Sequence, residues 1–382
     1  MNPPSAPTPA DPPAPSLETR LTRDTGIRLP IIGGAMYPCS NPELVGAVSA
    51  AGGIGVLQPV SLTWVHGHDF REGLQLIREL AGGAPVGMNA LIEGSSRRYR
   101  ARMEAWIEIA LDEGVRFFVT SLGNPRWVVD RVSPHGGLVY HDVTERKWAL
   151  KGRDAGVHGL IGVNRRAGGH PGPRTAAALL DEVRDLGLPV VCAGGVSTPE
   201  HFVDALRLGY DGVQMGTRLI ATPECSAAES YKQAILEAGE DDIVWSERIT
   251  GVPVSVIDTP YIRSMGLESG PFARWMLGGR RRKHWMRTFY TLQAAWALRR
   301  AATDGSESGS GSKSGSGSKP GSGSKSGSGS GREIWQAGRS VAGIDRLRPV
   351  AEILAAFEAA GSSGSDPERR SDPERRSDPG EA

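Results

Sequence analysis

The stretch Gly159-Leu160-Ile161-Gly162-Val163-Asn164-Arg165-Arg166-Ala167-Gly168-Gly169-His170 joins a short apolar run to a glycine-rich turn. A run this short, with almost no polar alternation, is typical of a strand in a parallel sheet that is covered on both faces. The paired glycines let backbone approach a ligand closely, and the histidine places a titratable ring beside it. The same glycines are also compatible with a simple turn of the chain.

Similar apolar runs, each followed by a turn and a longer amphipathic stretch, recur along the chain. There are eight: 29–33, 54–57, 85–89, 116–120, 138–141, 159–163, 189–192 and 212–215. This alternation is the signature of βα units, and eight units predict an α/β fold of the (β/α)8 TIM barrel type. An open, doubly wound sheet has a similar composition, so it is the count that favours a closed barrel. Asn41-Pro42-Glu43 and Thr198-Pro199-Glu200 predict capped helix starts.

The regular alternation ends after Thr217, and the composition then changes several times. A smaller, α-rich accessory lobe should follow the barrel, and a Gly/Ser linker with periodic lysines should precede an amphipathic helix at 349–360. The expected organisation is a disordered Pro-rich tail at 1–16, the barrel at 17–228, the accessory lobe at 229–304, the flexible linker at 305–331, a C-terminal segment packing back on the barrel at 332–361, and a disordered charged tail at 362–382.

Charge and cysteine content point to no special environment. Lys and Arg number 44 against 43 Asp and Glu, a net charge of +1, so no global field attracts nucleic acid or an anionic membrane. The basic cluster at 280–284 is better explained as a solvated helix face. The three cysteines lack metal-ligand spacing, and we expect buried, reduced thiols, with Cys192 a core residue and no metal site. Without a long apolar run, the chain is expected to be cytoplasmic.

The candidate functional residues follow the predicted strands, where a barrel places its active site. Asn89 ends the third strand and the glycine-histidine stretch follows the sixth. Gly194-Gly195 follows the seventh strand and Gly216-Thr217 the eighth. Glycine loops after these last two strands are suited to holding a phosphate on backbone N–H groups.

These motifs together carry a resemblance. The segments Val86-Gly87-Met88-Asn89, Ala167-Gly168-Gly169-His170, Gln214-Met215-Gly216-Thr217 and Trp335-Gln336-Ala337-Gly338 resemble the nitronate monooxygenase family, also called 2-nitropropane dioxygenase-like. The resemblance implies a barrel that binds FMN noncovalently and His170 as the catalytic base. It also implies cofactor contacts from Asn89, Gly168, Gly195, Gln214, Met215, Gly216 and Thr217.

The resemblance breaks just before Ala167. The family pattern Gln-Gly-x-Glu is replaced by Val163, Asn164, Arg165 and Arg166. Val163 cannot hydrogen-bond a flavin, so either Asn164 substitutes or the cofactor is held more loosely. The two adjacent arginines lead to the hypothesis of an anionic small-molecule substrate, against the alternative that both simply face water.

The function that the resemblance implies is FMN-dependent oxidation of nitronates and nitroalkanes by O2 to a carbonyl compound and nitrite. A histidine at the site is suited to removing the acidic proton beside a nitro group near neutral pH. An NAD(P)H-dependent flavin enoyl reductase is the main alternative, with His170 as proton donor. A non-catalytic flavin-binding scaffold and a flavin-free barrel acting on sugar phosphates remain further alternatives. The oligomeric state is left open.

Overall fold

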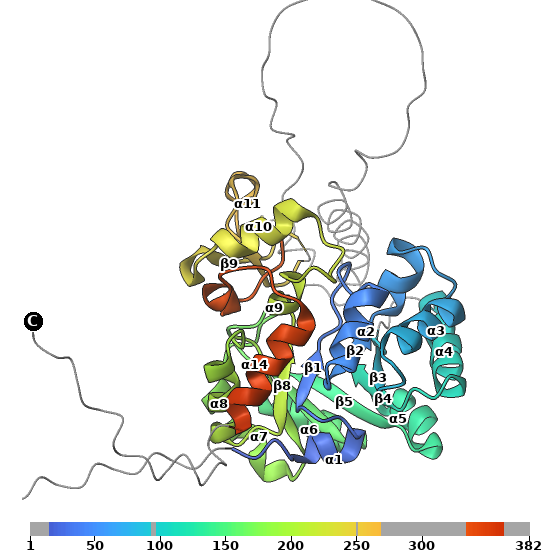
Figure 1. The fold of residues 1–382 in the computed structure, drawn as a ribbon. Coiled ribbons are helices and arrows are strands. Elements are labelled where there is room, and N and C mark those ends of the chain that lie inside the picture. Colours follow the sequence, from blue (N-terminus) through green and yellow to red (C-terminus); the bar gives the residue numbers. More distant parts are fainter. Residues whose placement is uncertain (1–14, 93–96, 250, 269–333, 363–382) are drawn as a thin grey trace, which may run out of the picture.

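The protein is described by a computed structural model that covers residues 15–92, 97–249, 251–268 and 334–362. Its centre is a closed barrel of parallel strands, each hydrogen-bonded to the next, in which β1 also pairs with β8 (Figure 1). The strands are β1 (Ile31–Gly33), β2 (Ile54–Leu57), β3 (Val86–Asn89), β4 (Phe117–Thr120), β5 (Leu138–Val143), β6 (Gly159–Val163), β7 (Val190–Ala193) and β8 (Gly212–Met215). The predicted (β/α)8 TIM barrel is therefore confirmed.

Helices follow the strands and cover the outside of the barrel. They are α2 (Pro42–Ala50), α3 (Phe70–Leu80), α4 (Arg97–Asp112), α5 (Arg126–Val132), α6 (Arg146–Asp154), α7 (Ala176–Val183), α8 (Pro199–Leu208) and the short α9 (Thr217–Ile220). The Thr198 side chain caps α8 by accepting a hydrogen bond from the His201 amide. The helix α2 begins as predicted, with Asn41 at the N-cap position and Pro42 at the first turn, but the Asn41 side chain makes no cap hydrogen bond and instead bonds Glu43, the Glu224 carbonyl and the Ser226 amide.

The barrel interior is apolar, and side chains that alternate along the strands fill it. Phe117 and Tyr140 lie there with ring centroids 5.1 Å apart, together with Ile32, Val56 and Ile161. The opposite faces of the strands pack on the helices in a larger cluster. This division fixes which side chains of each strand point toward the barrel axis.

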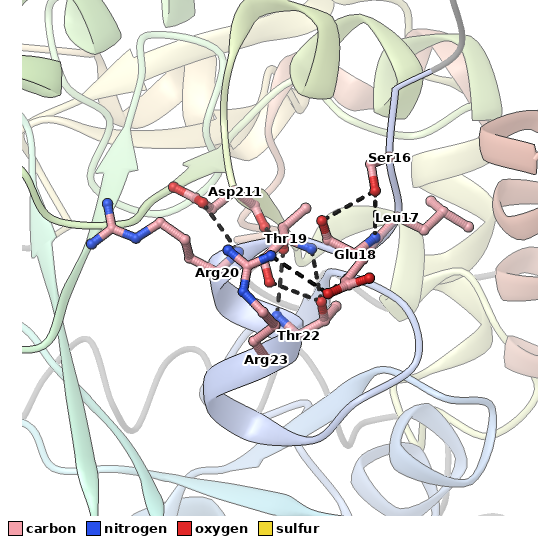
Figure 2. Close-up of polar contacts among 8 residues, drawn as sticks. All are labelled: Ser16, Leu17, Glu18, Thr19, Arg20, Thr22, Arg23 and Asp211. Carbon is pink, nitrogen blue, oxygen red and sulfur yellow. Dashed lines mark hydrogen bonds and ion pairs between the residues drawn. The ribbon is translucent and has the colours of Figure 1, made fainter.

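The helix α1 (Arg20–Thr25) closes the amino-terminal end of the barrel, and its Leu21 belongs to the interior cluster. Figure 2 shows how polar contacts fasten this segment to Asp211, which precedes β8. The Thr19 hydroxyl donates to the Asp211 carbonyl at 2.6 Å, and the Arg20 amide donates to its carboxylate at 3.4 Å. A hollow of about 560 Å³ lies between this segment and 206–211. It is at the end of the barrel that serves stability rather than catalysis.

The C-terminal helix α14 (Val350–Ser362) lies beside α8 and α2 on the outside of the barrel (Figure 1). Phe357 packs on Phe202 of α8 with ring centroids 5.4 Å apart. The Glu224 carboxylate accepts a hydrogen bond from the amide of Val350 at 2.9 Å. The chain thus completes the outer layer with a helix that is distant in sequence.

The described residues between α9 and α14 form a smaller unit at the end of the barrel opposite α1 (Figure 1). It contains α10 (Glu229–Glu237), η4 (Glu240–Asp242), an antiparallel pair of strands, β9 (Ile243–Ser246) and β10 (Val254–Ile257), α11 (Pro260–Met265) and η5 (Arg339–Gly343). The basic cluster at 280–284 and the linker at 305–331 lie outside the described residues. None of the helices within the described ranges has the length and apolar character needed to cross a membrane.

Candidate functional site

Two buried amides stand at the carboxyl ends of β3 and β8. Asn89 is paired in register with Val119, and Gln214 with Ala193, and both of these neighbours face the barrel interior. Asn89 and Gln214 therefore point toward the axis as well. Neither Asn89 Oδ1 nor Gln214 Oε1 has a hydrogen-bond partner among the residues that the structure describes. Because leaving a buried acceptor unpaired costs about 1–3 kcal/mol, these atoms fit a polar ligand lying over the barrel.

Asp142 on β5 is a third polar group of this kind, and the sequence analysis missed it. It lies two residues beyond Tyr140, so strand alternation turns it toward the axis. Its Oδ1 atom is buried without a partner in the described part of the chain. Burial raises the pKa of Asp142 to about 7. The signal was an acidic residue between the apolar Tyr140 and Val143 of a strand.

Loops after β6 and β7 are tied together by Asn164, which is fully buried. Its side chain donates to the Gly194 carbonyl at 2.9 Å and accepts from the Arg166 amide at 2.8 Å. It is therefore occupied in holding the loops. Whether Asn164 substitutes for the flavin contact that Val163 cannot make therefore stays a prediction.

Glycines after β6 and β7 permit very close backbone approaches. Gly194 and Gly195 have positive φ angles of 114° and 84°, which favour glycine. A Cβ atom on Gly194 would lie 2.5 Å from the Ala167 amide nitrogen, and one on Gly168 would lie 3.0 Å from that of Gly338. The Thr217 hydroxyl accepts a hydrogen bond from the Gly338 amide at 3.0 Å. The structure thus brings Gly168, Gly195 and Thr217 of the predicted site together.

The other two residues of the Gln214–Thr217 motif, Met215 and Gly216, lie in different surroundings. Met215 is buried in the layer between strands and helices, so its side chain faces away from the barrel axis. Its carbonyl accepts from the Gly34 amide at 2.8 Å. Gly216 lies beside Met36, whose sulfur would be 3.3 Å from an added Cβ.

The exposed His170 lies in the loop after β6, next to β10. The preceding residue, Gly169, forms an antiparallel bridge to Ser255, whose amide donates to the Gly169 carbonyl at 2.7 Å. The Ser255 hydroxyl is buried and lacks a partner in the described ranges. The histidine is therefore held at the carboxyl end of the barrel, where the accessory unit meets the mouth.

The segment from Ile334 to Arg339 joins the barrel to the accessory unit. Trp335 stacks on Tyr231 of α10, with ring centroids 6.1 Å apart, and its carbonyl accepts from the Ile257 amide. The Tyr231 hydroxyl donates to the Gln336 carbonyl. The sequence marked this segment only by its resemblance, because its partners are about a hundred residues away.

The adjacent arginines 165 and 166 have different surroundings. Arg165 is exposed, whereas Arg166 forms an ion pair of 2.8 Å with Glu240. Arg339 approaches the same carboxylate oxygen at 3.4 Å. The two adjacent arginines therefore do not form a free bidentate pair, and an anionic substrate stays a prediction.

Burial keeps two other titratable side chains of the barrel strands, His141 and Cys192, uncharged. Burial lowers the pKa of His141 to about 4, so this ring is neutral, and it bonds the Thr120 hydroxyl. Burial raises the pKa of Cys192 to about 12, which keeps the thiol protonated. All three cysteines are free and buried. Within the described ranges no group of three His, Cys, Asp or Glu side chains is placed to hold a metal ion.

Comparison with known proteins identifies the family to which this barrel belongs. A family model for nitronate monooxygenase matches residues 18–318. The chain belongs to the nitronate monooxygenase family. A probable nitronate monooxygenase of Staphylococcus saprophyticus is 26% identical over 291 residues, which cover 65% of this chain and 81% of the relative.

Other similar proteins carry different names. A Rhodococcus jostii protein named (3aS,4S,5R,7aS)-5-hydroxy-7a-methyl-1-oxo-octahydro-1H-indene-4-carboxyl-CoA dehydrogenase is 28% identical over 251 residues, 65% of this chain and 68% of that protein. The solved structure of FabK from Thermotoga maritima has a TM-score of 0.70 at 25% identity and covers 93% of this chain and 99% of its own. Nitroalkane oxidase from Streptomyces ansochromogenes, with a TM-score of 0.64 at 22% identity over 90% of this chain and 99% of its own, shares the fold. The chain is a flavin-dependent oxidoreductase.

Proposed function

We propose that this chain binds FMN at the carboxyl ends of its barrel strands and oxidises nitronates and nitroalkanes with O2 to a carbonyl compound and nitrite. The observation that carries the proposal is the pair of buried amide oxygens of Asn89 and Gln214 beside the glycine loops, neither of which has a partner among the described residues. A flavin ring presents hydrogen-bond donors and acceptors on one edge, which match amide side chains. Membership of the family supports a flavin at this position.

The cofactor's phosphate is expected at the loops after β7 and β8. Gly195 and Gly216 have no side chains that would block an anion from their backbone N–H groups, and Thr217, at the start of α9, adds a hydroxyl. Loops after the seventh and eighth strands are the usual phosphate site of such barrels. One compact site of this kind suits the single phosphate of FMN. Gly168 and the backbone of Met215 would complete the contacts.

His170 is the proposed base. It lies in an exposed loop at the barrel mouth, where a nitroalkane can reach it, and histidine side chains exchange protons near neutral pH. Its task is to remove the proton on the carbon that bears the nitro group. When bound, FMN supplies the electron transfer to O2. The chain supplies orientation, through Asn89 and Gln214, and proton transfer.

The His170→Asn variant tests this assignment. The variant should still bind FMN. Because a preformed nitronate has already lost the proton, the variant should also still turn over nitronates. It should lose about 10²- to 10⁴-fold in kcat/KM for the neutral nitroalkane. His135→Asn, in an exposed position at the other end of the barrel, is the matched control and should behave as wild type. Equal losses on both substrates would refute the role of base.

A second candidate is the oxidation or reduction of an acyl thioester, including NAD(P)H-dependent enoyl reduction. Relatives named as carboxyl-CoA dehydrogenases favour it. A group of exposed arginines at the start of α4 also favours it, because arginines bind phosphate groups well. They lie beside the barrel mouth and are Arg97, Arg98, Arg100 and Arg102. Anaerobic mixing separates the candidates. Bleaching of bound flavin by NADPH or by an acyl-CoA would favour thioester chemistry. Bleaching by a nitronate would favour the leading proposal. The absence of bleaching by any of them would favour a non-catalytic flavin-binding scaffold.

A further inference from the structure

We propose that Arg166 and Arg339, bridged by Glu240, provide the positive charge by which this chain selects a phosphorylated flavin over an unphosphorylated one. This inference rests on the flavin site of the proposed function. It concerns three residues that come from separate parts of the chain: the loop after β6, the 3-10 helix η4 and the C-terminal segment.

Arg166 lies directly over the proposed phosphate loop. Its Nε atom would be 2.7 Å from a Cβ on Gly195, so the side chain crosses the loop after β7. Nη1 then reaches the Glu240 carboxylate at 2.8 Å. The guanidinium group is therefore fixed in place next to the backbone that is expected to hold the phosphate.

Arg339 reaches the same place from the C-terminal segment. Its amide donates to the Arg166 carbonyl at 2.9 Å, while the preceding Gly338 amide bonds the Thr217 hydroxyl. Its Nη1 atom lies 3.4 Å from the Glu240 oxygen that Arg166 also contacts. The two cations thus lie beside the loops after β7 and β8 together.

The charges of this group do not cancel. Two guanidinium groups share one carboxylate, which leaves a net charge of +1 among these three side chains. The Nε atom of Arg339 is buried and has no partner in the part of the chain that the structure describes. The single carboxylate of Glu240 balances the charge of only one of the two arginines. An additional anion is the group that would balance the second.

The phosphate of FMN is such an anion, and riboflavin is the same molecule without it. Because the ring contacts at Asn89 and Gln214 are common to both ligands, the ratio of the two affinities isolates the phosphate. The three side chains are 35–38% exposed, so solvent screens the interaction, and a moderate, salt-dependent effect is expected.

The test is a fluorescence titration of flavin-free, full-length protein with FMN and with riboflavin. Arg166→Met should weaken FMN binding by about 10-fold, while riboflavin affinity changes by less than about 2-fold; a 10-fold change equals about 1.4 kcal/mol. Arg166→Lys should recover part of the loss. Arg165→Met is the matched control, since it removes the same charge from the adjacent exposed position and should leave the ratio unchanged.

Glu240→Gln provides a prediction of opposite sign. Removing the carboxylate leaves two uncompensated guanidinium groups, so FMN should bind about 3-fold or more tightly and riboflavin should not. The inference is overturned if Arg166→Met weakens both flavins equally, which would mark a structural role, or if Glu240→Gln weakens FMN. If wild-type protein binds neither flavin, the proposed function itself fails; if it binds both equally well, only this inference fails.

Discussion

Ionisation of Asp142 should make the protein less stable as the pH rises. Burial raises the pKa of this carboxyl group from 3.8 to about 7 in the folded chain. Between these values the unfolded state loses its proton while the folded state keeps it. The free energy of unfolding therefore falls with rising pH across this interval and levels off above it.

The size of the effect follows from the interval. Over the two pH units from 5 to 7, one group contributes about 1.4 kcal/mol per unit, or nearly 3 kcal/mol. Because Asp142 is only partly covered, water screens some of this, and we expect about 2–3 kcal/mol. An amide side chain cannot ionise, so Asp142→Asn should gain this amount relative to wild type between pH 5 and pH 8.

Urea unfolding of flavin-free protein at pH 5, 6.5 and 8 measures the difference. Removing the flavin excludes stabilisation by ligand binding. Asp204→Asn, on the exposed surface of α8, is the control and should shift the free energy of unfolding by no more than about 0.5 kcal/mol at any pH. A difference between Asp142→Asn and wild type that does not vary with pH would refute the reasoning.

Three further predictions concern packing and reactivity. Gly338→Ala places a Cβ 2.5 Å from the Gly168 amide, so it should lower the free energy of unfolding by about 2–4 kcal/mol in thermal unfolding and weaken FMN binding. Gly239→Ala, whose Cβ meets its nearest neighbour at 3.5 Å, should change little. Equal effects of the two variants would contradict the close approach. Phe357→Ala should lower the free energy of unfolding by about 3–5 kcal/mol, because it removes the contact of α14 with Phe202. The control Ala355→Ser, at an exposed position, should lower it by less than about 0.5 kcal/mol. A small loss for Phe357→Ala would show that α14 is not held there. In native protein at pH 8, Cys192 should resist iodoacetamide because its thiol is buried and protonated, and mass spectrometry showing its rapid alkylation before unfolding would disprove this.

The barrel was predictable because each strand is a short apolar run, and both faces of a parallel sheet are covered. The predicted runs began one or two residues early at 29, 85, 116 and 189, since the ladder of hydrogen bonds starts only where a neighbouring strand is alongside. The run predicted at 138–141 stops two residues before the end of β5 at Val143, because the polar Asp142 concealed the end of this strand.

The polar contacts of the site were less accessible to sequence reasoning. Asn41 stands at the predicted N-cap position, but its side chain does not bond the helix because its amide finds partners near residue 224, which local patterns do not reveal. The partner of Arg166 lies 74 residues away, on Glu240, and Thr217 bonds Gly338 across 121 residues. Local spacing predicted which loops reach the barrel mouth, whereas the tertiary fold decides which side chains meet there.

The central claim is that a flavin lies over the barrel on Asn89 and Gln214. The most direct measurement is the visible spectrum of purified protein that has been saturated with FMN and separated from excess by gel filtration. We predict about one FMN per chain with wild type, and a marked loss with Gln214→Leu. If the wild-type protein is correctly folded and all the FMN still elutes in the small-molecule fraction, the account is contradicted.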